Sequence, residues 1–166
     1  MSSTFEPVDN NTLKAIKKKF GDAVLEACFD KGDLVAIVAP GKIHDIIVFL
    51  RDSPELDFKM LIDLFVVDYM PRKPRFEVVY HLHCLPRNER IRLRVQLDEK
   101  KCEVDTITDL YSVANWLERE AWDMFGVVFK GHPNLKRLLM YESFEGHPLR
   151  RDYPINKRQP LIGPKN

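Results

Sequence analysis

The amino-acid sequence predicts an α/β protein of the α+β type: a two-layer sandwich with a mixed sheet, helices mainly on one face, and an extended C-terminal docking tail. Three observations lead to this prediction. Apolar residues alternate strictly from Ile91 to Leu97, as in a strand with one buried face. Other segments carry apolar stripes at helical spacing. From Pro148 onward the chain is rich in proline and basic residues and has no apolar period.

These patterns divide the chain into an α/β domain over residues 1–130 and an extended C-terminal segment over residues 131–166. The end of this segment cannot bury a core of its own. We therefore expect it to be either disordered or laid out on another protein.

The first predicted element is an amphipathic helix. Asn10 offers an N-cap, and Gly21 ends the apolar stripe. The stripe consists of Leu13, Ile16 and Phe20. The other face carries Lys14, Lys17, Lys18 and Lys19. A basic helix can rest on lipid or on a partner, but a solvated face is the favoured interpretation.

A hairpin and a second helix follow. Residues 24–29 and 34–39 are predicted strands, because residues 30–33 between them have the sequence Asp-Lys-Gly-Asp of a tight turn. Pro40 and Gly41 then introduce a helix. Its apolar side is formed by Ile43, Ile46, Ile47 and Leu50.

The middle of the chain predicts three more strands. Residues 54–57 form a turn or a short helix. Residues 60–67 are apolar and become β-branched, which favours a buried strand, with a helix in the first half as the alternative. Residues 76–85 and 91–97 are the clearest strands.

A third helix is predicted over residues 113–125, with Gly126 as the residue that ends it. Residues 127–129 are then extended, a Gly-His-Pro turn follows at 131–133, and an apolar and basic run continues to Met140.

The overall composition describes an ordinary globular protein. The chain has 166 residues, a formal net charge of +1, 45% hydrophobic and 31% charged residues. This charge balance argues against nucleic-acid binding as the main activity. No window approaches a membrane span, and the N-terminus has no export signal. The three cysteines, Cys28, Cys84 and Cys102, are widely spaced, which predicts free thiols. They do not provide the usual ligand set of an iron–sulfur cluster.

Charged residues are concentrated in the third helix. Arg119 and Asp123 stand at i, i+4 and can pair on one face. Glu120 and Asp123 form the alternative, a two-carboxylate arrangement for acid–base or metal chemistry. The favoured interpretation is a charged network that clamps the helix to the segment after it, because no Cys or His on the helix completes a ligand set.

The histidines allow two readings. His81 and His83 lie on one strand face and could share a metal, but no third ligand is evident. His132 and His147 each stand in Gly-His-Pro, which holds the ring in a defined turn. This indicates a specific contact rather than hydrolysis, since no Ser or Cys nucleophile has a motif context. No Gly-rich nucleotide-binding loop is present.

Several of these motifs together resemble one family. Residues 118–126 (Glu-Arg-Glu-Ala-Trp-Asp-Met-Phe-Gly), 131–139 and 146–154 (Gly-His-Pro-Leu-Arg-Arg-Asp-Tyr-Pro) are similar to the signature of the 30 kDa subunit family of proton-translocating NADH:quinone oxidoreductase, respiratory complex I. Residues 67–69 and 75–82 extend the resemblance. Arg151 stands where the family pattern has Lys, which keeps the charge.

The resemblance implies a non-catalytic subunit of the peripheral arm that binds no cofactor and no metal itself. The holoenzyme carries FMN and iron–sulfur clusters, and it couples electron transfer from NADH to quinone with proton translocation. The implied partners are the large quinone-site subunit and the small terminal-cluster subunit. The implied location is the cytoplasmic face of the bacterial inner membrane, with only indirect membrane contact. The C-terminal segment is then the part that docks on partner subunits.

The resemblance also identifies the expected interface residues. Four of these, Arg119, Arg137, Arg150 and Arg151, are suited to bidentate pairs with partner carboxylates. Trp122, Phe125, Phe144 and Tyr153 are anchor types found at interfaces. The full signature set is Glu118, Arg119, Glu120, Asp123, Phe125, Gly126, His132, Pro133, Lys136, Arg137, His147, Pro148, Arg150, Arg151, Asp152 and Tyr153.

Two alternatives remain open. The first is the equivalent subunit of a membrane-bound nickel–iron hydrogenase or a related complex, since such complexes share part of these motifs. The second is a stand-alone metal-dependent enzyme that uses His81, His83 and a carboxylate.

Overall fold

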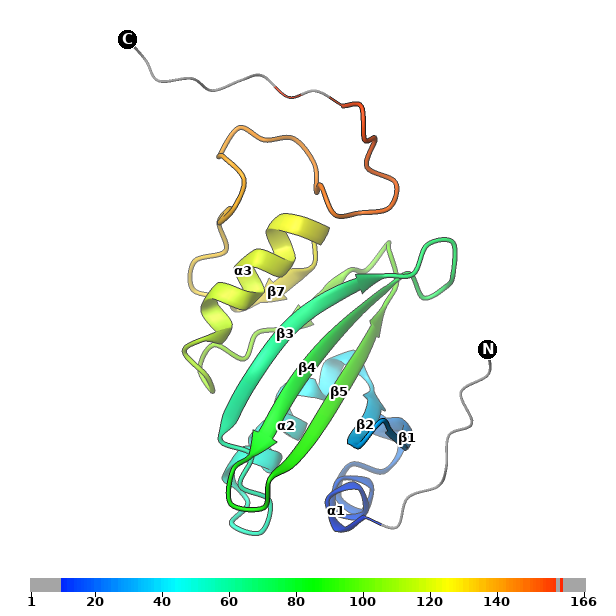
Figure 1. Cartoon of the computed structure of the whole chain (residues 1–166), viewed down its shortest axis with the longest axis vertical. Coiled ribbons are helices and arrows are strands. Elements are labelled where there is room, and N and C mark those ends of the chain that lie inside the picture. Colours follow the sequence, from blue (N-terminus) through cyan, green and yellow to red (C-terminus); the bar gives the residue numbers. More distant parts are fainter. Residues whose placement is uncertain (1–9, 158, 160–166) are drawn as a thin grey trace.

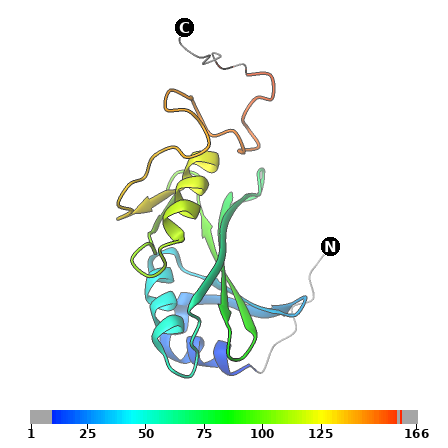
Figure 2. The ribbon, with the colours of Figure 1, turned by 60° about the vertical axis from the view of Figure 1, so that its left-hand side comes forward.

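The computed structural model describes residues 10–157 and 159. Its centre is a five-stranded sheet in the order β1-β2-β5-β4-β3 (Figure 1). β2 and β5 run parallel, and the other neighbours are antiparallel, so the sheet is mixed. α2 and α3 lie on one side of these strands (Figure 2). The predicted fold class is confirmed.

The N-terminal elements form as their sequence patterns predict. The side chain of Asn10 accepts hydrogen bonds from the backbone N–H groups of Thr12 and Leu13, and this caps α1 (Asn11–Phe20). A short 3-10 turn (Gly21–Ala23) leads into β1 (Val24–Asp30), which pairs with β2 (Asp33–Val38). Lys31 and Gly32 both have positive φ in the two-residue turn, which matches the twist of a hairpin.

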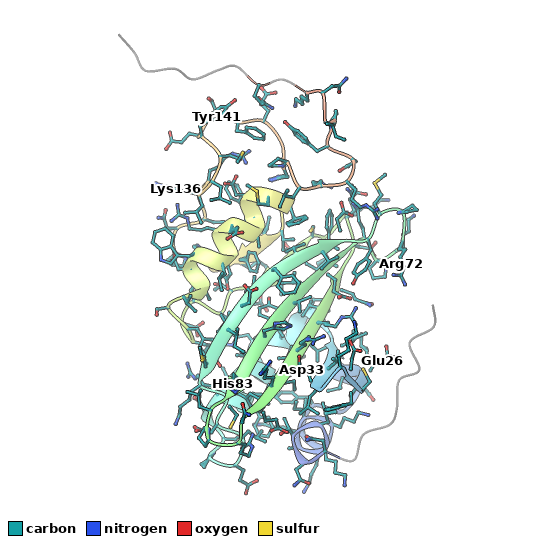
Figure 3. All side chains as sticks on the ribbon, viewed as in Figure 1. Glu26, Asp33, Arg72, His83, Lys136 and Tyr141 are labelled. Atoms are coloured by element: carbon teal, nitrogen blue, oxygen red, sulfur yellow. The ribbon has the colours of Figure 1, made fainter. Side chains whose placement is uncertain are left out.

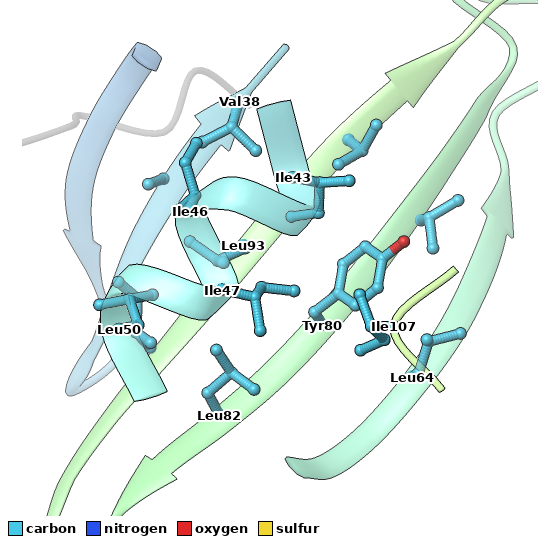
Figure 4. Close-up of a cluster of buried hydrophobic side chains, with 14 of the residues drawn as sticks. Val38, Ile43, Ile46, Ile47, Leu50, Leu64, Tyr80, Leu82, Leu93 and Ile107 are labelled. Carbon is cyan, nitrogen blue, oxygen red and sulfur yellow. The ribbon is translucent and has the colours of Figure 1, made fainter. Parts of the chain in front are cut away.

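The core lies between α2 and the sheet (Figure 4). A 3-10 turn (Pro40–Lys42) precedes α2 (Ile43–Asp52), as the Pro-Gly pair predicts. All four apolar residues of the predicted stripe are completely buried. They pack toward Tyr80, Leu82 and Leu93 on the central strands. Burial of such side chains contributes about 1.5–3 kcal/mol each.

The remaining strands form an antiparallel meander. β3 (Met60–Asp68) is a strand along its whole length, so the helical alternative for its first half is wrong. β4 (Phe76–Cys84) and β5 (Glu89–Leu97) follow, each bounded by a turn. On β5 the alternating residues Ile91, Leu93 and Val95 are completely buried. The second face of the sheet has no helix on it in Figure 2.

A second, small sheet completes the fold. β6 (Glu103–Asp105) runs parallel to β7 (Val128–Lys130), and α3 (Ala114–Phe125) connects them. The sequence patterns predict α3 and the extended segment but give no signal for β6. Gly126 ends α3 in the left-handed conformation, as predicted. Beyond Lys130 the described residues form turns and extended chain with no further helix or strand.

Candidate functional site: the fastened C-terminal segment

Asp123 organises the start of the C-terminal segment. Its carboxylate is completely buried on the inner side of α3. One oxygen accepts a hydrogen bond from Arg137 at 2.6 Å, and the other accepts from the backbone N–H groups of Leu138, Leu139 and Met140 at 2.9 Å each. Burial raises the pKa of Asp123, but these four donors outweigh it and lower the pKa. The carboxylate is therefore a charged anchor for three successive peptide groups.

Arg137 holds the next turn of the same segment. Its guanidinium donates to the carbonyl oxygens of Phe144 and Gly146 at 2.6 and 3.0 Å. The rings of Trp122 and Phe144 lie 5.6 and 5.4 Å from it, within cation–π range. Arg137 is thus fully engaged within the chain.

Arg119 lies on α3, one turn before Asp123, and it also holds the C-terminal segment. It donates to the backbone carbonyls of Lys136 and Arg137 at 3.2 and 3.0 Å. The pairing of Arg119 with Asp123 that the spacing permits is therefore not formed. The i, i+4 rule considers neighbours on the helix surface, whereas Asp123 points into the protein.

The two Gly-His-Pro turns place their rings against α3. Nδ1 of His147 hydrogen-bonds to the carbonyl of Asp123 at 3.1 Å, and its ring lies edge-on to Trp122. A Cβ atom at Gly126 would stand only 2.7 Å from the His147 ring. His132 contacts the carbonyl of Asn115 at 3.1 Å. Each histidine makes a specific backbone contact, as the motif indicates.

A second cluster fastens the end of the segment to the sheet. The guanidinium of Arg75 donates to both oxygens of Asp68 at 3.0 and 2.8 Å, and to both oxygens of Asp152 at 3.0 and 2.6 Å. Glu99 accepts from Arg75 at 2.6 Å and from Arg150 at 2.8 Å. We call this five-residue network the tail clamp.

Backbone contacts complete the tail clamp. The N–H of Arg151 donates to Asp68 at 2.9 Å, and its guanidinium reaches the carbonyl of Met70 at 2.8 Å. Burial raises the pKa of Asp68, yet the hydrogen bonds from Arg75 and two backbone groups lower it to about 2. The hydrogen bond from Arg75 lowers the pKa of Asp152. Both carboxyl groups are thus charged acceptors at neutral pH.

Glu118 is another buried carboxyl, and no cation among residues 10–157 and 159 forms an ion pair with it. It is completely buried and accepts hydrogen bonds from the hydroxyl of Thr106 and the N–H of Ile107. Burial raises its pKa to about 7, although these two donors oppose the shift. Glu118 therefore holds the segment between β6 and α3 and titrates near neutral pH.

The remaining signature residues differ in their surroundings. Phe125, at the end of α3, packs against the core, and Pro148 is half-buried, whereas Pro133 and Lys136 are exposed. Tyr153 stacks on Phe144 with ring centroids 6.0 Å apart. Glu120 is exposed while Asp123 is buried, so they do not form a two-carboxylate pair.

The tail makes contacts with its own domain that the sequence patterns do not predict. Leu149 donates to the carbonyl of Met124, and the tail clamp engages Arg150 and Asp152. The last residues, 160–166, lie outside the described part of the chain. Most of the arginine groups expected to face partner carboxylates are occupied within the chain.

Sequence reasoning missed Asp68, Arg75 and Glu99 as partners of the tail. Asp68 and Arg75 belong to the upstream motifs. The sequence feature that could have indicated them is a charged residue at the end of one apolar strand and another just before the next. Trp116 was also missed; its side chain is 57% exposed on α3.

The proposed metal pair, His81 and His83, is split between two environments. The ring of His81 packs edge-on against Phe65, while His83 contacts Asn88 at 3.3 Å. Within residues 10–157 and 159, no three His, Cys, Asp or Glu side chains come together in a metal-binding group.

With this geometry established, similarity to known proteins decides the family. Residues 36–159 match the family described as the respiratory-chain NADH dehydrogenase, 30 kDa subunit. The chain belongs to this family.

Two relatives, both named as the C subunit of NADH-quinone oxidoreductase, show how far the similarity extends. The relative from Roseiflexus sp. (strain RS-1) is 47% identical over 153 residues, which covers 92% of this chain and 88% of the relative. The relative from Citrifermentans bemidjiense is 41% identical over 157 residues, with 93% and 96% covered.

Solved structures agree with this family. A trypsin-resistant fragment (1–134) of Nqo5 has a TM-score of 0.64 and 30% identity, and the match covers 75% of this chain and 99% of the fragment. A chain of the membrane-bound sulfane sulfur reductase, an archaeal respiratory membrane complex, has a TM-score of 0.73 and 25% identity, covering 87% of this chain and 84% of that one.

The family places the protein in the peripheral arm of an NADH:quinone oxidoreductase. It also makes other subunits of that complex its partners. The relatives favour this complex over the nickel–iron hydrogenase alternative. No helix among the described residues combines the length and the apolar character needed to cross a membrane.

Proposed function

We propose that this chain is a non-catalytic subunit that positions its neighbours in the complex. Its partners are the large quinone-site subunit and the small terminal-cluster subunit, at the cytoplasmic face of the bacterial inner membrane. FMN and the iron–sulfur clusters belong to other subunits. Contact with the membrane is indirect, through those partners.

One observation supports this role most strongly. Polar signature side chains fix the shape of the C-terminal segment, while three of its apolar side chains are exposed to solvent. Leu139, Leu149 and Ile155 are 57%, 56% and 105% exposed. Exposed apolar side chains on a fastened backbone are typical of a protein–protein interface.

Preorganisation explains why fastening favours docking. A segment that is already ordered loses less conformational entropy when a partner binds it. Two anchors, the buried Asp123 carboxylate and the partly exposed tail clamp, hold the segment at residues 137–140 and 150–152. Electron transfer and quinone binding require well-fixed neighbours, and a rigid surface supplies this.

The test uses a tagged chain expressed in its native host. We expect it to co-purify with subunits that carry FMN and iron–sulfur clusters, and we expect the chain purified alone to hold no redox-active group. Flavin and iron content of both preparations decides this. A redox group on the isolated chain, or the absence of the partners, would refute the proposal.

A matched pair of variants tests the surface itself. Leu139→Asp combined with Leu149→Asp is expected to lower recovery of the complex at least tenfold, since it places charges in an apolar contact. Leu25→Asp combined with Leu85→Asp is the control, because both side chains are more than half exposed, at 62% and 65%, and lie outside the C-terminal segment. Equal recovery of the two variants would contradict the proposal.

A further inference from the structure

The connection between β3 and β4 forms a projecting tip with uncompensated positive charge. Figure 3 shows Arg72 at the outer end of this connection, at the same end of the molecule as the C-terminal segment. Arg72 and Lys73 are both exposed. Three other exposed cations, Lys42, Lys59 and Lys130, each pair with a nearby Asp. Within the described residues neither tip cation has an ion-pair partner.

The tip cations line a small hollow of about 100 Å³. Arg94 and Glu77 lie in the same hollow, and Arg94 holds Glu77 with two hydrogen bonds of 2.7 and 2.9 Å. This pair is neutral as a unit. The charges of Arg72 and Lys73 therefore remain uncompensated, and the hollow favours an anionic group.

The tip is held in a fixed shape. The N–H of Tyr69 donates to the carbonyl of Arg75, and the N–H of Arg72 donates to the carbonyl of Tyr69. The guanidinium of Arg72 stacks over the ring of Tyr69 at 5.3 Å. Arg151, beside the tail clamp, donates from its guanidinium to the carbonyl of Met70 at 2.8 Å. The tip cations are thus presented on an ordered backbone.

A second hollow adjoins the first on the face of the sheet opposite α2. It has a volume of about 280 Å³ and shares Tyr69, Glu77 and Arg94 with the first. Its apolar side is formed by Val35, Phe65, Val67 and Val79. Phe65 is 37% exposed there.

From these observations we infer that the two hollows together bind an extended segment of a partner subunit. That segment carries an acidic side chain for the tip hollow and an adjacent apolar side chain for the second hollow. This inference rests on the proposed function, because it requires the chain to be assembled with partners.

Charge reversal at the tip tests the inference in the native complex. Arg72→Glu combined with Lys73→Glu is expected to lower recovery of partner subunits about tenfold, because it opposes the acidic side chain. Lys17→Glu combined with Lys18→Glu on α1 is the matched control, since it changes the net charge equally at exposed positions. Recovery of the tip variant equal to that of the control would overturn the inference.

A photo-cross-linking residue in place of Lys73 identifies the occupant. The expected product is a cross-link to a partner peptide that contains Asp or Glu beside an apolar residue. A cross-link to lipid, to a second copy of this chain, or to no protein would overturn the inference. If the unaltered chain recovers no partners, the proposed function is refuted. If the unaltered chain and the tip variant both recover partners at the level of the control, only the inference about the tip is refuted.

Discussion

Arg75 and Asp152 form a two-pronged ion pair, with N–O distances of 2.6 and 3.0 Å, although 77 residues separate them in the chain. Arg75 lies immediately before β4, and Asp152 lies in the C-terminal segment. The pair therefore closes the segment back onto the sheet. Asp68 and Glu99 complete the network around the same guanidinium.

Removal of Asp152 is predicted to loosen the segment without unfolding the domain. Asp152→Ala leaves Arg75 paired with Asp68 and Glu99, so the free energy of unfolding is expected to fall by less than about 1 kcal/mol. Hydrogen exchange in residues 148–157 should become about fivefold faster, while exchange in β4 stays constant. Glu142→Ala, an exposed carboxylate in the same segment, is the control. Unchanged exchange in both variants would show that the ion pair does not hold the segment.

Removal of Asp123 is predicted to be far more costly. Asp123→Ala leaves the Arg137 guanidinium and three backbone N–H groups without their acceptor, and the free energy of unfolding should fall by about 3 kcal/mol. Urea denaturation measures this loss. Glu120→Ala, on the exposed side of α3, should stay within about 0.5 kcal/mol of the wild type. A loss below about 1 kcal/mol for Asp123→Ala would be inconsistent with a buried anchor.

Any side chain at Gly126 is predicted to lower the free energy of unfolding, for two reasons that can be measured separately. The Gly126 φ of +81° disfavours an L-residue, and a Cβ would stand 2.7 Å from the His147 ring. Gly126→Ala should therefore cost about 1–3 kcal/mol. In a His147→Ala background the overlap disappears and only about 1 kcal/mol of backbone strain remains. Gly41→Ala, with no atom within 4 Å of its Cβ, is the control.

A double-mutant cycle of Gly126 and His147 separates the two costs. The predicted coupling is the difference between the cost of Gly126→Ala in the two backgrounds. If that cost is the same in both, the His147 ring does not approach the backbone as described.

Glu118 is predicted to make stability depend on pH between about 4.5 and about 7. Its pKa in the folded protein is raised from 4.5 to about 7, so the folded state binds the proton more tightly. Stability therefore decreases as pH rises through this window and is constant above it. Glu118→Gln retains the hydrogen bonds of the protonated acid and should remove this decrease, which is roughly 1–3 kcal/mol.

Urea midpoints at pH 5 and pH 7.5 for the wild type and Glu118→Gln measure this effect. Other titratable groups are common to both proteins and cancel in the comparison. Asp68 affects stability in a different pH range. Because its pKa is lowered in the folded protein, its contribution to the free energy of unfolding is lost only as pH falls from about 4 toward about 2. Parallel pH profiles would refute the role of Glu118.

The elements that could be predicted are those with a local signal. The alternation on β5, the stripe on α2 and the cap at Asn10 each depend on neighbouring residues alone, and the structure confirms all three. β6 has three residues and no apolar period. It exists because β7 pairs with it, and this partner is distant in sequence.

The site could be predicted only in part for the same physical reason. The motifs identified the right segment, and the preference for a network that clamps α3 to that segment agrees with the contacts of Asp123. The actual partners depend on tertiary structure: Asp123 faces inward to Arg137, and Arg75 reaches Asp152 only after the sheet has formed. The i, i+4 rule for neighbours on a helix surface cannot predict the Asp123–Arg137 pair or the Arg75–Asp152 pair.

The most direct test is the assembly of an Arg150→Ala chain in a host that lacks its own copy. Arg150 contacts Glu99 at 2.8 Å at the edge of the tail clamp. We predict that NADH:quinone activity and the amount of complex in the membranes fall several-fold, whereas the unfolding midpoint of the purified chain changes little. Lys100→Ala, at an exposed position nearby in sequence, should assemble normally. Normal yield and activity for Arg150→Ala would contradict the docking role of the fastened segment.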